Sequence, residues 1–172
     1  MKALVCSDFG STQDLSLETR DDLEPGAGEV LIEVKAAGVN FPDILTVQGK
    51  YQFKPPLPFV PGGEVSGVVT KLGEGVTTRK VGDEVVGMMQ VGGFATQAVT
   101  SEYTTFPKGN NMSYEQAAGF AVTYGTSYYA LKQKAQLKPG ETVLVLGAAG
   151  GVGIATIQIA KAMGHGNCCC QY

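Results

Sequence analysis

Residues 140–164 read GETVLVLGAAGGVGIATIQIAKAMG, and this stretch decides the fold of the second half of the chain. A Pro-Gly turn leads into residues 142–146, an aliphatic and β-branched run that predicts a buried parallel strand. A glycine-rich elbow follows at residues 147–153. Apolar residues then recur at helical spacing, and Gly164 is placed to end the helix. The stretch therefore predicts a strand, a tight turn and a helix in that order.

The elbow has the chemistry of a diphosphate site. A helix N-terminus carries free N–H groups and a partial positive charge, so it attracts a pyrophosphate. Small residues let the backbone approach that group closely, and Gly153 would allow tight packing of helix on strand. The candidate cofactor-binding residues of the elbow are Ala149, Gly150, Gly151, Val152 and Gly153. Alanine stands where the plainest G-x-G-x-x-G has glycine, so the match is a variant. The alternative is an ordinary tight turn that binds nothing.

The same stretch resembles the signature of a known family. It resembles the quinone oxidoreductase (zeta-crystallin) branch of the medium-chain dehydrogenase/reductases at Gly140, Glu141, Leu144, Ala148, Ala149, Gly150, Gly151, Gly153, Gln158 and Lys161. The resemblance covers residues 1–164 and stops abruptly there. It implies an α+β chain with a GroES-like, partly open β-barrel over residues 1–112. A connecting helix or helices (113–134), the first βα unit of a truncated Rossmann domain (135–164) and an atypical tail (165–172) would follow.

Patterns in the first half agree with a partly open barrel of short strands. Strands are expected at residues 1–7 with a hairpin partner at 15–18, and at 29–37, 64–72, 84–90 and 94–100, the last two joined through Gly92 and Gly93. Pro42 suits the first turn of a short helix over residues 41–47. Ser113 and Gln116 form a predicted capping box at the start of a long helix or helix pair, which would be interrupted near residues 123–125.

Bulk composition excludes several classes of protein. The chain has 172 residues, 44% hydrophobic and 17% charged, so it is globular rather than disordered. A net charge of −3 without a basic stripe argues against a nucleic-acid partner. Neither a membrane-length apolar run nor a signal peptide is present, which argues against a membrane protein and favours a cytoplasmic location.

Cysteine and histidine usage excludes further chemistry. Cys6 stands alone, Cys168, Cys169 and Cys170 are adjacent, and His165 is the single histidine. This is no disulfide framework, and three neighbouring thiols cannot form a tetrahedral zinc site. A histidine-based catalytic triad has no base before the tail. We therefore expect no metal. Zinc-dependent relatives carry a cysteine in the segment matching residues 39–40 and a histidine in that matching 62–64, so the chain resembles the zinc-free branch.

The nucleotide-binding half is unfinished. A doubly wound domain needs several parallel strands, and residues 142–146 supply one. The residue that reads the ribose should lie about 20 positions past the elbow, where residues 165–172 end the chain instead. We interpret these as an unrelated tail from truncation, alternative splicing or a frame change; the alternative is a redox or metal role for the cysteines. An unpaired strand at residues 143–146 should bury itself against the barrel or cause self-association.

The resemblance also implies where the cofactor and substrate lie. The nicotinamide would sit in the cleft between the two domains, lined by Asn40 and near Thr123. Tyr51 would face substrate, stacking on a flat quinone or donating a proton. Taken from sequence alone, Asn40 could equally be a turn residue, Thr123 a helix interruption, and Tyr51 an amphipathic surface residue.

The implied reaction is hydride transfer from NADPH to a quinone or an α,β-unsaturated carbonyl, in a family of homodimers. NADH is not excluded, because the segment that reads the 2′-phosphate is missing. The protein would hold donor and acceptor close and dry, since the cofactor carries the hard chemistry. The alternative is a non-catalytic GroES-like module with a vestigial elbow.

Overall fold

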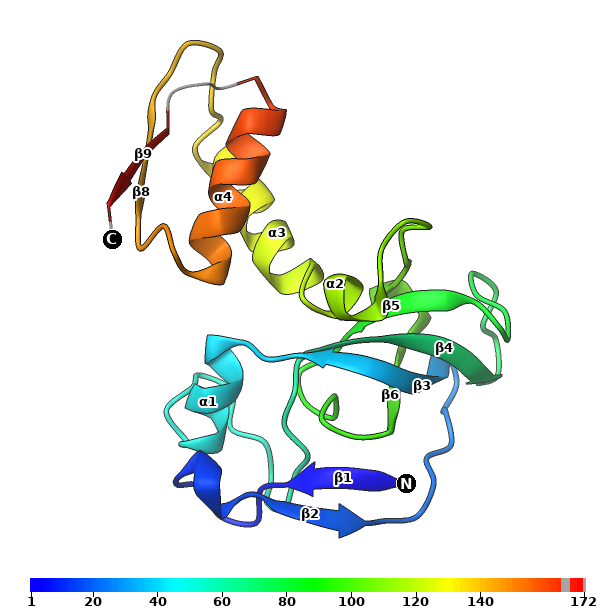
Figure 1. Cartoon of the computed structure of the whole chain (residues 1–172). Coiled ribbons are helices and arrows are strands. Elements are labelled where there is room, and N and C mark those ends of the chain that lie inside the picture. Colours follow the sequence, from blue (N-terminus) through cyan, green and yellow to red (C-terminus); the bar gives the residue numbers. More distant parts are fainter. Residues whose placement is uncertain (165–167, 172) are drawn as a thin grey trace. The chain divides into compact units, whose positions relative to one another are not determined.

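The computed structural model describes residues 1–164 and 168–171, which divide into two units, Met1–Gly119 and Phe120–Tyr172 (Figure 1). Each unit is built differently. The first is mainly antiparallel β-structure, whereas the second combines helices with parallel strands. The helices expected to connect the domains are divided between the two units.

A five-stranded antiparallel sheet forms the main part of the first unit. Its strand order is β6-β3-β4-β5-β7. The strands are β3 (Glu29–Gly38), β4 (Glu64–Leu72), β5 (Glu84–Met88), β6 (Gln97–Ser101) and β7 (Thr105–Pro107). Alternating apolar side chains from β3, β4, β5 and β6 meet in a fully buried core of Val30, Ile32, Val65, Val69, Val85 and Ala98. The sequence analysis did not predict β7. Although β5 and β6 are consecutive in the chain, β5 pairs with β4 and β7, whereas β6 pairs with β3.

A hairpin and a short helix complete this unit. β1 (Lys2–Val5) pairs antiparallel with β2 (Ser16–Thr19), as predicted. Isolated bridges join Ala3 to Ala95 and Cys6 to Phe59, linking the hairpin region to later parts of the chain. Short 3-10 turns, η1 (Thr12–Asp14) and η2 (Glu102–Thr104), precede β2 and β7. α1 (Phe41–Val47) begins with proline in its first turn, so the predicted helix is confirmed.

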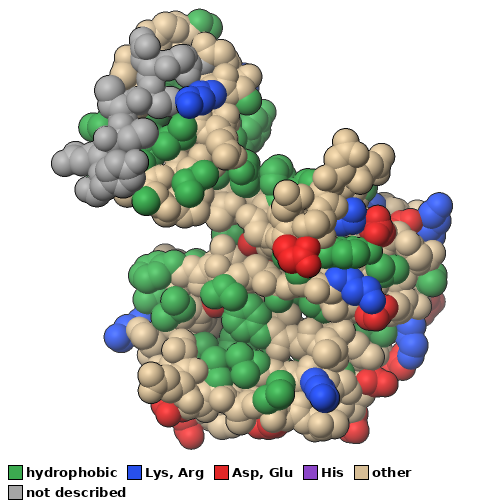
Figure 2. Space-filling model, in the orientation of Figure 1, with side chains coloured by type: hydrophobic (Ala, Val, Ile, Leu, Met, Phe, Trp, Pro, Cys, Tyr) green, Lys and Arg blue, Asp and Glu red, His purple; other side chains and the backbone are tan. Residues whose placement is uncertain are grey.

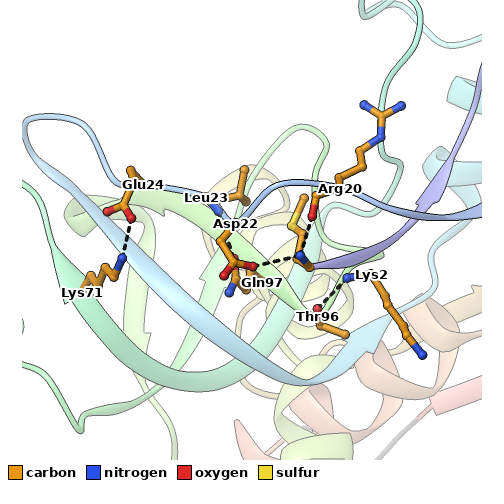
Figure 3. A network of polar contacts seen from close by, with 9 residues as sticks. Lys2, Arg20, Asp22, Leu23, Glu24, Lys71, Thr96 and Gln97 are labelled. Carbon is orange, nitrogen blue, oxygen red and sulfur yellow. Dashed lines mark hydrogen bonds and ion pairs between the residues drawn. The ribbon is translucent and has the colours of Figure 1, made fainter.

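The segment between β2 and β3 is held by polar contacts (Figure 3). The Met1 ammonium donates hydrogen bonds to the backbone oxygen of Arg20 (2.6 Å) and to Asp22 Oδ1 (2.9 Å). The hydrogen bond from that ammonium lowers the pKa of the Asp22 carboxyl. The Leu23 N–H donates to Gln97 Oε1 on β6 (3.0 Å). The start of the chain is thereby connected to the sheet.

Two helices follow the sheet, one in each unit. α2 (Tyr114–Ala118) starts with the predicted capping box of Ser113 and Gln116 and belongs to the first unit. α3 (Ala121–Tyr128) continues into a π-helical turn, η3 (Tyr129–Lys134). The predicted break near residues 123–125 is wrong: the helices separate at Gly119, which is the C-cap of α2. Gly125 lies inside α3 because one interior glycine only lowers helix propensity.

The second unit contains the predicted βα pair. β8 (Val143–Leu146) leads through the elbow into α4 (Gly151–Ala162). Gly164 follows with φ +85°, the left-handed conformation expected of a glycine that ends a helix.

The prediction of a single parallel strand is wrong. β9 (Cys168–Gln171) pairs parallel with β8, in a register that sets Val143 opposite Cys168 and Leu146 opposite Gln171. Strand pairing uses backbone groups, so the unpaired edge of β8 can pair with residues 168–171 despite their unusual sequence. The cysteine side chains and His165 lie outside what the structure describes, so the alternative of a redox or metal role for the cysteines stays a prediction.

One face of β8 is open to solvent. Leu144 is 62% exposed and Leu146 69%, whereas Val145 between them is 5% exposed. This alternation follows from the period of a strand, in which successive side chains point to opposite faces. Burial of this face against the barrel and self-association both stay predictions.

Candidate functional site

The elbow reverses the chain within four residues. Gly147 has φ +68°, a left-handed conformation that favours glycine. The Gly150 N–H donates to the Gly147 carbonyl oxygen (3.1 Å), which closes the turn. Gly150 then serves as the N-cap of α4 in an extended conformation. The predicted sequence of strand, elbow and helix is thus present with the expected backbone.

Two glycines of the elbow have other atoms close to the position of a Cβ. A Cβ atom at Gly153 would lie 2.4 Å from the Gly147 oxygen and 2.8 Å from Ala148 Cα. The close approach predicted at Gly153 is therefore present, although its neighbour is the elbow backbone rather than the strand. A Cβ at Gly151 would lie 3.1 Å from the Thr123 methyl carbon. Thr123 thus backs the elbow from inside α3 and does not interrupt a helix.

The start of α4 is accessible to a ligand. Ala149, Gly150, Gly151 and Val152 are exposed, whereas Gly153 is buried. No side chain caps the helix, so the N–H groups of its first turn have no side-chain acceptor. This combination of open N–H groups, small residues and a helix dipole suits the diphosphate of a dinucleotide.

A pair of hydroxyls behind the elbow was missed by the sequence analysis. Ser127 on α3 is fully buried, and its Oγ lies 3.0 Å from the Val152 carbonyl oxygen and 2.9 Å from that of Thr123. Thr156 Oγ1 lies 2.7 Å from the same Val152 oxygen and 3.0 Å from Ser127 Oγ. The signal that could have found this pair is a hydroxyl at a core-facing position of each helix.

In the first unit, two carboxylates hold Asn40. Its Nδ2 donates to Glu64 Oε1 (3.0 Å), and its backbone N–H donates to Asp43 Oδ2 (2.7 Å). Glu64 is fully buried. A Cβ at Gly38 would lie 2.6 Å from Glu64 Oε1 and 2.2 Å from the Ala118 oxygen, so only glycine leaves room for the carboxylate. Asn40 is therefore a restrained residue with a fixed amide orientation.

Asp43 is an unusual carboxyl because it is 8% exposed. Burial raises its pKa, while hydrogen bonds from the backbone N–H groups of Asn40 and Gly63 act in the opposite direction. The two hydrogen bonds join the start of α1 to the loop before β4. Asp43 thus holds the backbone on both sides of the Asn40–Glu64 pair.

Tyr51 is less restrained than Asn40. It is 37% exposed and follows α1, and its N–H donates to the Leu45 oxygen (3.2 Å). Within the described residues no hydrogen bond joins its hydroxyl to Asn40 or Glu64.

Figure 2 shows hydrophobic side chains gathered on the visible face of the first unit. Next to Asn40 in sequence, Val39 (74% exposed) and Phe41 (70% exposed) present apolar surface to solvent.

Two negative findings hold for the described part of the chain. Residues 1–164 and 168–171 contain no cluster of three or more His, Cys, Asp or Glu side chains able to hold a metal ion. Among the helices of those residues, none has both the length and the apolar character needed to cross a membrane.

Comparison with known proteins identifies the family. The model of the alcohol dehydrogenase GroES-like domain matches residues 26–138. The chain belongs to this family. It is a member of the medium-chain dehydrogenase/reductase superfamily and is similar to quinone oxidoreductases, which confirms the resemblance drawn from the elbow.

Individual relatives support the assignment. The quinone oxidoreductase-like protein 2 homolog of Nematostella vectensis is 43% identical over 161 residues, covering 92% of this chain and 44% of that protein. The solved human synaptic vesicle membrane protein VAT-1 homolog-like protein is 36% identical, with a TM-score of 0.91, over 94% of this chain and 52% of that one. The quinone oxidoreductase of Thermus thermophilus, solved also in complex with NADPH, is 38% identical with a TM-score of 0.84, over 95% and 51%. The chain spans about half the length of these relatives.

Proposed function

We propose that the chain carries the elbow of an NADPH-dependent oxidoreductase that reduces a quinone or an α,β-unsaturated carbonyl without zinc. The observation that supports this most is the exposed, uncapped start of α4 at Gly150 and Gly151. It stands in a family with a relative, 38% identical, that was solved with NADPH. NADPH is favoured over NADH by that relative and by a mycobacterial protein, 36% identical, that was also solved with NADPH.

The elbow residues fit the cofactor by their lack of bulk. The N–H groups of Gly151, Val152 and Gly153 would donate to the diphosphate, which the helix dipole also attracts. Ala149 and Gly150 leave the approach to these N–H groups open. When bound, NADPH supplies the hydride, and the protein's part is to bind, orient and exclude water.

The remaining site residues have separate roles in the proposal. Asn40, with its amide fixed by Glu64, would hydrogen-bond the nicotinamide or the acceptor. Thr123 would support the cofactor from behind Gly151. Tyr51 would stack on a flat quinone or donate the proton that must accompany hydride addition to a carbonyl. We propose a cytoplasmic location and homodimer formation only on the sequence and family arguments given above.

A non-catalytic GroES-like module is the second candidate. It is favoured by the parallel sheet of the described residues, which consists of β8 and β9. In this case the elbow would be a structural remnant, and the chain would neither bind nor oxidise NADPH.

Titration of the chain with NADPH, followed by calorimetry, distinguishes the two candidates. We expect saturable binding, and we expect Gly151→Leu to abolish it because the side chain presses on Thr123 and displaces the turn whose N–H groups would bind the diphosphate. Gly125→Ala is the matched control, since a Cβ at this helical glycine meets nothing within 4 Å. Quinone-dependent NADPH oxidation then tests catalysis. Equal affinity of Gly151→Leu and the wild type would remove the elbow from the site.

A further inference from the structure

The first turn of α4 is held through one carbonyl group. The Val152 oxygen lies 3.0 Å from Ser127 Oγ on α3 and 2.7 Å from Thr156 Oγ1 one turn further along α4. Ser127 is fully buried, and a buried hydroxyl without a partner would be costly. The two hydroxyls therefore have defined positions at the contact between α3 and α4.

The two hydroxyl hydrogens of this pair can be arranged in more than one way. Two hydroxyl hydrogens serve three acceptors, which are the oxygens of Thr123 and Val152 and the Ser127 Oγ itself. When Thr156 donates to Ser127 and Ser127 donates to Val152, a continuous chain of hydrogen bonds joins the two helices. When Thr156 donates to Val152 instead, Ser127 donates either to Thr123 within α3 or to the same Val152 oxygen, since a carbonyl oxygen can accept two hydrogen bonds. Whenever Ser127 donates to the Val152 oxygen, it links α3 directly to the turn that would face the diphosphate.

Close packing restrains the same turn from two other directions. Gly153 has the elbow backbone against it, with Gly147 oxygen 2.4 Å from the position of a Cβ. Gly151 has the Thr123 methyl carbon 3.1 Å from the corresponding position. The direction of the N–H groups at the helix start is therefore set by backbone packing together with the hydroxyl pair.

We propose that Ser127 and Thr156 are positioning residues for the dinucleotide site: their hydroxyls fix the first turn of α4 so that its N–H groups converge on the diphosphate. The inference rests on the proposed function, since it assumes that the elbow binds NADPH. Neither residue touches the cofactor in this proposal. Both act through the Val152 carbonyl.

The test is the dissociation constant of NADPH for Ser127→Ala, Thr156→Val and Thr156→Ser, measured by calorimetry. A net hydrogen bond contributes about 1 kcal/mol, so we expect about fivefold weaker binding for Ser127→Ala and for Thr156→Val. Thr156→Ser keeps the hydroxyl and should bind within about twofold of the wild type. Amide exchange at Gly151, Val152 and Gly153 without cofactor should become faster in the first two variants, as a readout independent of binding.

Ser66→Ala is the matched control, because Ser66 is also fully buried and its hydroxyl donates to a helix carbonyl, that of Tyr114 (2.5 Å), in the first unit. It should lower the melting temperature without changing NADPH affinity. Unchanged affinity in both Ser127→Ala and Thr156→Val would overturn the inference while leaving the proposed function in place. Absence of NADPH binding by the wild type would overturn both.

Discussion

Replacing Gly153 with alanine should destabilise the second unit, and the structure indicates by how much. The new Cβ would lie 2.4 Å from the Gly147 oxygen, whereas carbon and oxygen normally approach to about 3.3 Å. About 0.9 Å of movement is therefore needed between two backbone segments. Overpacking of this kind costs about 1–3 kcal/mol, and the upper part of that range applies because no flexible side chain can yield.

An opposing term must be subtracted. Alanine is favoured over glycine inside a helix by about 1 kcal/mol, so the net loss for Gly153→Ala should be about 1–2 kcal/mol. Gly125→Ala isolates this term, because Gly125 lies in α3 with no atom near the position of a Cβ. That variant should gain about 0.5–1 kcal/mol.

Urea unfolding followed by circular dichroism at the helical band would measure both variants, since α3 and α4 are the longest α-helices among the described residues. The reasoning predicts opposite signs for the two glycine-to-alanine changes. Gly153→Ala should also weaken any NADPH binding, because the elbow has to move. If both variants proved equally stable, the close contact at the elbow would be wrong.

Three other predictions concern separate parts of the chain. Glu102 accepts hydrogen bonds from Thr78 Oγ1 (2.7 Å) and from the Thr78 N–H (2.8 Å), which lower the pKa of its carboxyl. Its contribution to stability should therefore be present above the pKa of glutamate in the unfolded chain, about 4.3, and be lost as the pH falls through the lower folded value. Glu102→Gln should flatten this part of the stability–pH curve, and an unchanged curve would count against the prediction. Asn40→Ala should cost about 1–3 kcal/mol in urea unfolding, because the buried Glu64 carboxylate loses a donor, and a variant as stable as the wild type would contradict the assigned contact. The exposed side chains of Leu144 and Leu146 should cause concentration-dependent self-association, which sedimentation velocity would measure. Replacing Leu146 with lysine should reduce this self-association, and a wild-type chain that stays monomeric at all concentrations would refute the prediction.

Local sequence signals predicted the elements that depend on few residues. Alternation indicated the strand that became β3, and Pro42 marked the first turn of α1. The elbow was predictable because left-handed backbone and close approach both demand glycine, as seen at Gly147 and Gly153. Ser113 and Gln116 predicted the start of α2 for the same local reason.

Long-range pairing was not predictable from such signals. β9 pairs with the backbone edge of β8, a long-range contact that the residues before it do not indicate. The break at Gly119 depends on how α2 packs on β3 and β4, which the pattern of residues 113–133 does not contain. The Ser127–Thr156 pair joins positions 29 residues apart in sequence, so neither hydroxyl carried a signal alone.

The parallel pairing of β8 and β9 depends on backbone groups, whereas the shape of the elbow depends on particular glycines. Main-chain pairing does not depend on side-chain identity, so residues 168–171 can pair with β8 next to the elbow without a typical strand sequence. The turn that begins α4 is then shielded from changes further along the polypeptide. Residues of that segment could thus be substituted extensively while the turn formed by Gly147 to Gly153 kept its shape.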